Sequence, residues 1–98
     1  MSYVINDSRG NLIAVVPDGT VNTTATSLTL VGRAYVDYGG FENENYVYLL
    51  ENFANDTEPG HALTGQLWYD TGNNVIRVWD GSANTWSGLS TQDYVQAQ

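Results

Sequence analysis

The stretch GQLWYDTGNNVIRVWDG, residues 65–81, contains two runs of β-forming residues separated by a short polar segment. Residues 66–70 and 75–79 are rich in aromatic and β-branched side chains, and the intervening TGNN is typical of a hairpin turn. We predict a type II′ turn centred on Gly72 and Asn73, because glycine suits its first central position. The stretch therefore predicts an antiparallel hairpin.

Successive side chains of a strand alternate between two faces, and this period assigns the hairpin's residues. The turn places Asp70 opposite Val75 and Trp68 opposite Arg77, where the guanidinium can form a cation–π pair with the indole. We predict that one face is the core and that the tryptophans of the other face contact a neighbouring chain or partner. The predicted core face holds Leu67, Tyr69, Ile76 and Val78, and the opposite face holds Trp68, Val75, Arg77 and Trp79.

This assignment predicts two different mutant phenotypes. Leu67→Ala should destabilise the isolated chain by about 2–5 kcal/mol, as truncation of a core side chain does. Trp79→Ala should leave the isolated fold largely intact and weaken assembly, as loss of an interface anchor does.

The same reasoning extends outward along the chain. Residues 3–16 are predicted to form a first hairpin, with turn residues between Asp7 and Asn11. Residues 27–31 alternate like a half-buried strand that ends at Gly32. Beyond the central hairpin, a third strand is expected to begin at residues 85–86.

One helix is expected near 40–55, because apolar residues recur there at helical spacing. The predicted buried stripe consists of Tyr46, Leu49, Leu50, Phe53 and Ala54. Phe41 and Tyr48 are seven residues apart and share a different face, which indicates either a second buried contact or simple packing of Phe41 at the helix entrance.

These elements predict an α+β fold of mostly short antiparallel strands and hairpins with one amphipathic helix. Ninety-eight residues suit one domain. We expect residues 1–89 to form a single strand-rich structural module and residues 90–98 to be a polar C-terminal tail.

The charge balance argues against several classes of partner. Three arginines, no lysine and eleven carboxylates give a net charge of −8, which repels nucleic acid and anionic membranes. No stretch approaches the roughly 18 apolar residues of a membrane span, and the N-terminus lacks the pattern of a signal peptide. The absence of cysteine removes disulfides, thiolate nucleophiles and zinc–thiolate sites.

Catalysis is not expected either. His61 is the sole histidine and follows a Pro-Gly turn, without a nearby nucleophile. The carboxylate pairs Glu42/Glu44 and Asp56/Glu58 are predicted to lie on a solvated surface rather than across a cleft. No calcium-binding loop or phosphate-binding glycine loop is present, so we predict no enzyme activity, no cofactor and no metal.

The aromatic residues are the remaining candidates for function. The tryptophans 68, 79 and 86 suit a carbohydrate-binding platform, but they equally suit a small core or a subunit contact. An apolar patch on the face away from the core usually marks an interface, which favours assembly. The candidate interface residues are Phe41, Tyr48, Trp68, Arg77, Trp79 and Trp86.

Four blocks of the sequence resemble a module of virion structural proteins in tailed bacteriophages. They are TSLTLVGR (26–33), YGG (38–40), YVYLLENFAN (46–55) and GQLWYDTGNNVIRVWDG (65–81), followed by Trp86. The resemblance covers about residues 3–87. In such modules the blocks occur in this order, within tail-fibre or baseplate proteins that often carry repeats.

The resemblance implies a non-enzymatic virion component, assembled in the host cytoplasm, that acts by self-association and by docking to other tail or virion proteins. It implies no catalytic residue, and its likeness to fibres favours a homotrimer. A receptor-recognition module that binds a host glycan through exposed tryptophans is the alternative. This chain carries a single copy, which leaves open its station in the virion: fibre, baseplate, neck or capsid surface.

Overall fold

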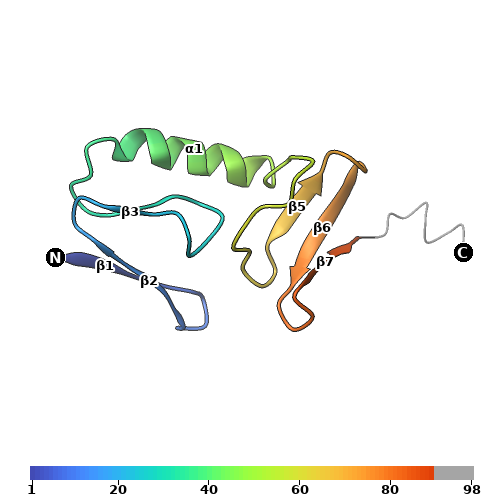
Figure 1. The fold of residues 1–98 in the computed structure, drawn as a ribbon, viewed down its shortest axis with the longest axis horizontal. Coiled ribbons are helices and arrows are strands. Elements are labelled where there is room, and N and C mark those ends of the chain that lie inside the picture. Colours follow the sequence, from blue (N-terminus) through green and yellow to red (C-terminus); the bar gives the residue numbers. More distant parts are fainter. Residues whose placement is uncertain (90–98) are drawn as a thin grey trace, which may run out of the picture.

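The structure is a computed structural model that describes residues 1–89, and the predicted polar tail at 90–98 lies outside the described residues. The elements in chain order are β1 (Ser2–Asn6), β2 (Leu12–Pro17), β3 (Val21–Asn22), β4 (Leu30–Val31), α1 (Tyr38–Leu50), β5 (Leu67–Asp70), β6 (Val75–Asp80) and β7 (Thr85–Gly88). The strands form three small antiparallel sheets, which confirms the predicted α+β class. In Figure 1, α1 runs along one edge, above β1–β4 at one end and near β5–β7 at the other.

The predicted N-terminal hairpin is confirmed, with β1 paired antiparallel to β2. Its inner face carries Ala14 and Val16, both buried, and Val16 has no exposed surface. Its outer face carries Val4 opposite Val15, and both side chains are exposed. The Asp7 carboxylate closes the turn by accepting hydrogen bonds from the backbone N–H groups of Arg9 and Asn11.

The strand predicted over residues 27–31 is much shorter, since only Leu30–Val31 pairs with β3. Side-chain oxygens compete with the sheet in the preceding segment. The amide oxygen of Asn22 accepts from the backbone N–H groups of residues 24 and 25, and Thr26 Oγ1 accepts from that of Leu28. These local bonds turn the chain and delay pairing until Leu30.

Helix α1 begins at Tyr38 and ends at Leu50, earlier than the predicted boundary near residue 55. A Schellman motif terminates it, with Asn52 in the left-handed conformation at φ 53°. Asn52 N–H donates to Leu49 O at 3.2 Å, and Phe53 N–H donates to Tyr48 O at 2.8 Å. The Phe53 and Tyr48 rings complete the motif with centroids 6.4 Å apart. Phe53 and Ala54 therefore lie outside the helix.

The predicted buried stripe on α1 is wrong, because no residue of the helix is buried and Leu50 is 83% exposed. Asn45 sets the orientation of the helix: its side-chain amide accepts from Thr29 N–H at 3.1 Å and donates to Thr29 O at 2.8 Å. Phe41 packs beside Tyr35, with ring centroids 5.8 Å apart. The body-facing side of α1 therefore carries Phe41, Asn45 and Leu49, whereas Tyr46 and Leu50 of the predicted stripe point away from it.

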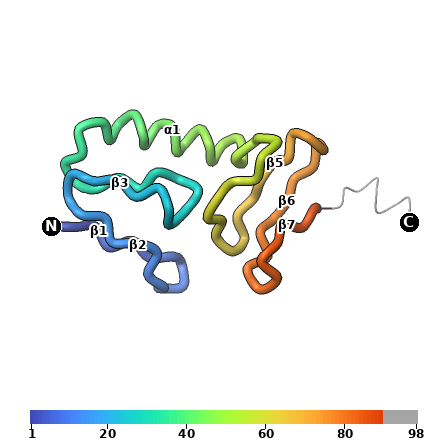
Figure 2. Tube along the Cα trace, in the orientation of Figure 1, coloured from blue at the N-terminus to red at the C-terminus, as the bar shows by residue number. Residues whose placement is uncertain are grey.

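The C-terminal sheet has the order β5-β6-β7, and the predicted register of its first hairpin is confirmed at every pair from Leu67↔Val78 to Asp70↔Val75. The turn differs from the predicted type II′. Gly72 does not adopt a positive φ, whereas Asn74 does, at 53°. The tube in Figure 2 shows this sheet as a unit separate from the N-terminal hairpins, with the loops between α1 and β5 running between them.

Candidate functional site

The three tryptophans form one cluster on one face of the C-terminal sheet. Trp79 pairs directly with Trp86 across β6 and β7, and their rings pack edge to face with centroids 5.2 Å apart. Trp86 packs in the same way on Trp68 at 5.3 Å. Trp68 is only 6% exposed, and its indole Nε1–H donates to Asn55 O at 3.1 Å. The cluster is therefore an intramolecular core.

The predicted assignment of the two sheet faces is wrong for Leu67 and Trp68, although the register is right. Leu67, predicted to be core, is 40% exposed, while Tyr69, Ile76 and Val78 are half-buried. The third strand is the cause, since Trp86 packs on Trp68 and Trp79, whereas Leu67 stays 40% exposed on the other face. Truncation of Leu67 should therefore cost little stability, and truncation of a tryptophan in the cluster should cost more.

Arg77 lies beside the tryptophan cluster and makes two contacts there. Its guanidinium carbon lies 5.8 Å from the centre of the Trp68 ring, which confirms the predicted cation–π pair. Its Nε donates to Asp70 Oδ2 at 3.1 Å, in an ion pair whose carboxylate is almost fully buried. Asp70 also accepts from the backbone N–H groups of Gly72 and Asn73 and from the Asn73 side chain. A buried carboxylate is tolerated here because all of these donors satisfy it.

The hydrogen bond from the Asn73 side chain, aided by that from Arg77 and opposed by burial, holds the pKa of Asp70 below its ordinary value. A lowered folded-state pKa stabilises the protein above the unfolded-state pKa of about 4, and this contribution disappears as the pH falls through the folded-state value. We expect Asp70→Asn to lower the unfolding midpoint at pH 7, and we expect this difference from the wild type to shrink below about pH 4. Urea unfolding of the variant and the wild type between pH 7 and pH 2.5 measures this difference.

Asp80→Asn is the matched control for that measurement. Asp80 is exposed and, within residues 1–89, accepts only from Ser82 and Ala83 in its own turn, without an arginine partner. Asp80→Asn should lower the unfolding midpoint at pH 7 by less than Asp70→Asn does. An equal or larger effect would contradict the role given to the Asp70–Arg77 pair.

A short segment after α1 joins the helix to the C-terminal sheet. Tyr69 N–H donates to Asn52 O at 2.9 Å, and Asn55 N–H donates to Tyr69 O at 3.2 Å. Asn55 O then accepts from both Thr71 N–H and the Trp68 indole. These bonds occupy the outer edge of β5. This joint, residues 52–55, therefore also protects the edge strand from pairing with another chain.

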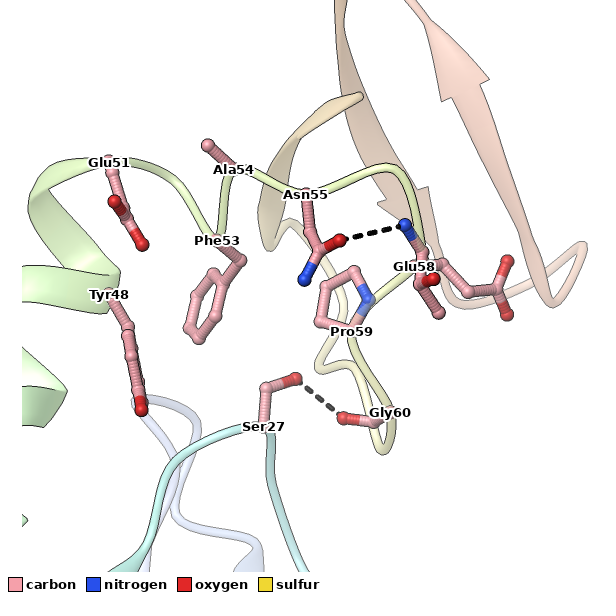
Figure 3. Close-up of a pocket in the computed structure, with 10 residues that line it drawn as sticks. Ser27, Tyr48, Glu51, Phe53, Ala54, Asn55, Glu58, Pro59 and Gly60 are labelled. Carbon is pink, nitrogen blue, oxygen red and sulfur yellow. Dashed lines mark hydrogen bonds between the residues drawn. The ribbon is translucent and has the colours of Figure 1, made fainter. Parts of the chain in front are cut away.

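Two shallow cavities, of about 300 Å³ and 320 Å³, flank this joint, and Ser27 and Phe53 line both. Figure 3 shows the first cavity, with Phe53 between Tyr48 and Pro59. The Ser27 hydroxyl donates to Gly60 O at 2.6 Å and accepts from Gln66 Nε2 at 2.8 Å. Both hydrogen bonds are structural and His61 makes neither, so Ser27 is not arranged as an activated nucleophile.

The structure brings four of the six candidate interface residues together. They contact one another within the chain: Trp68, Arg77, Trp79 and Trp86. Phe41 and Tyr48 lie on α1 and contact Tyr35 and Phe53. The sequence reasoning assigned Asp70 to a turn but missed its burial and its ion pair with Arg77, and it missed the residues that hold the joint, Asn52 and Asn55. A usable signal was present, because both turns of the C-terminal sheet repeat Asp-x-x-x-Asn, at 70–74 and 80–84. In each, the asparagine has φ 53°.

In the part of the chain that the structure describes, no cluster of three or more His, Cys, Asp or Glu residues is placed to hold a metal ion. No helix within residues 1–89 is both long and apolar enough to cross a membrane. The chain matches no known family model, no curated protein and no solved structure.

Proposed function

We propose that this protein is a non-enzymatic structural subunit of a bacteriophage virion, a tail-fibre or baseplate component. It acts by associating with copies of itself and by docking to other virion proteins. Its place of action is the virion, after assembly in the host cytoplasm.

The observation that carries this proposal is the small amount of apolar surface that the chain buries by itself. Only Ala14, Val16 and Trp68 are buried apolar residues among residues 1–89. Among residues 1–89, fifteen large apolar residues are exposed, and most of them lie on the N-terminal hairpin and α1. Large exposed apolar patches typically mark interaction sites. Association supplies the burial that the isolated chain lacks.

The blocks that resemble phage tail modules also have structural roles, which supports the proposal. Gly32, in the TSLTLVGR block, lies buried against the backbone at the end of β2. The LLENFAN block supplies the end of α1 and the joint, and the LWYDT block supplies the strand that the joint pairs with. These roles are those of a scaffold rather than of a reaction centre.

Glycan binding through the tryptophans has less support. Trp68 is buried, and Trp79 and Trp86 are half-buried and packed edge to face, so their flat faces do not form one open platform. A glycan array with Trp79→Ala as the control tests this alternative. Specific binding by the wild type that a Trp79→Ala variant loses, while circular dichroism shows the variant folded, would favour it over assembly.

Light scattering against concentration tests the proposed self-association. We expect the mass to rise from that of one chain, 10.8 kDa, toward that of a trimer between low and high micromolar concentration. The thermal unfolding midpoint should rise over the same range, because association stabilises the folded state by mass action. A constant monomer mass at several hundred micromolar, with an unchanged midpoint, contradicts the proposal. Antibody labelling of the tails of intact particles tests the virion assignment separately.

A further inference from the structure

We propose that copies associate head to tail, with the outer face of α1 in one copy packed on the outer face of the β1–β2 hairpin in the next. This inference rests on the proposed self-association and names the two surfaces that produce it. Because the surfaces differ, the contact is heterologous, and such contacts close into rings or extend into filaments.

The first surface is the side of α1 that points away from Asn45. At 100° per residue, Val47 and Leu50 lie opposite the Asn45 side chain, which faces the body of the molecule through Thr29. Tyr46 lies beside them, and all three are exposed. Figure 1 shows α1 along one edge of the fold.

The second surface is the outer face of the β1–β2 hairpin, formed by the cross-strand pair Val4 and Val15. Val4 is 62% exposed, whereas Ala14 and Val16 on the inner face are buried. A two-stranded sheet alone is marginally stable, and strands buried on both faces have continuous apolar runs such as Leu12–Val16. The exposed apolar face of this hairpin is therefore suited to contact with a second layer.

The distribution of charge selects the hairpin of another copy as the partner of α1. Residues 34–60 contain six carboxylates and no arginine, so two α1 faces packed together would oppose like charges. Residues 1–33 contain two arginines and two aspartates. The side chains of Arg9 and Arg33 are 62% and 53% exposed, against 15% and 31% for Asp7 and Asp18. Arg9 pairs with Asp7 and Arg33 with Asp18, so the hairpin region is close to neutral and repels an acidic helix less than a second helix would.

In a ring, each copy uses α1 toward one neighbour and the hairpin toward the other, so both exposed surfaces are buried at once. A pair of helices would leave the hairpin uncovered in every copy.

Complementation between two full-length variants tests the proposal. Val47→Glu disrupts the α1 surface and retains a good helix former, and Val4→Glu disrupts the hairpin surface. Each variant alone should be monomeric, with self-association weakened at least about tenfold, the effect of 1.4 kcal/mol. Mixed in equal amounts, they retain one intact contact, between α1 of the Val4→Glu chain and the hairpin of the Val47→Glu chain. Light scattering of the mixture should therefore give a heterodimer that grows no further.

Circular dichroism establishes that each variant is folded, and Val15→Thr, which keeps a β-branched side chain, is the milder hairpin variant. Leu89→Glu, on an exposed residue of neither surface, should assemble like the wild type. Val4→Glu that self-associates normally overturns the inference in favour of helix-to-helix pairing. A folded pair that fails to form a heterodimer overturns it as well. A wild type that remains monomeric instead contradicts the proposed function itself.

Discussion

Trp68→Ala is expected to destabilise the protein by about 3–5 kcal/mol, the range for truncation of a buried tryptophan. The substitution removes the ring under Arg77, the edge-to-face partner of Trp86 and the indole N–H that donates to Asn55 O. It thereby disturbs the tryptophan cluster and the joint with α1 together. Small domains have only about 5–15 kcal/mol of stability in total, so the variant should be largely unfolded at modest denaturant concentrations.

Leu67→Ala is the control, because Leu67 neighbours Trp68 in β5 but lies on the opposite, more exposed face. Its expected cost is about 1 kcal/mol. Guanidinium unfolding, monitored by the fluorescence of Trp79 and Trp86 at a concentration below self-association, compares the two. A larger loss for Leu67→Ala would restore the assignment of faces that the sequence alone suggested.

The strand period and turn residues were sufficient to predict the C-terminal hairpin, including the pairing of Trp68 with Arg77. The period separates two faces but does not say which one is covered. That depended on Trp86, which comes from a third strand and packs between Trp68 and Trp79. Three indoles can bury one another without a second layer, a solution that simple alternation of apolar residues does not indicate.

The helix illustrates a different limit. Apolar spacing correctly predicted that a helix exists, but it predicted the wrong buried side because one polar residue, Asn45, makes the fixing contact with Thr29. The spacing also extended the helix through Phe53, whereas Asn52 ends it by adopting a positive φ. The exposed apolar residues that remain on α1 conflict with a self-sufficient monomer. They cease to conflict if the chain folds as part of an assembly.

Gly32→Ala is the second substitution with a large expected effect, about 2–4 kcal/mol of lost stability. Gly32 is buried where the segment after β4 crosses the end of β2. An added Cβ would collide with Pro17 O and would lie 2.9 Å from Thr20 O. Both atoms belong to the backbone, so no side-chain rotation relieves the collision. The two backbone segments must move apart. This movement also strains the hydrogen bonds from Gly32 N–H to Thr20 O and from Gly19 N–H to Arg33 O, each 2.7 Å long.

Gly60→Ala is the matched control, since a Cβ at Gly60 meets no atom within 4 Å and its φ is not positive. It should leave stability unchanged or raise it by about 0.5 kcal/mol, through a less flexible unfolded chain. Thermal unfolding of both variants at one concentration provides the comparison. Because Gly32 holds the β3–β4 segment against the end of β2, its substitution should also expose Val16 and increase binding of a hydrophobic dye. A Gly32→Ala protein as stable as Gly60→Ala would show that the close backbone approach at the end of β2 is not required for the fold.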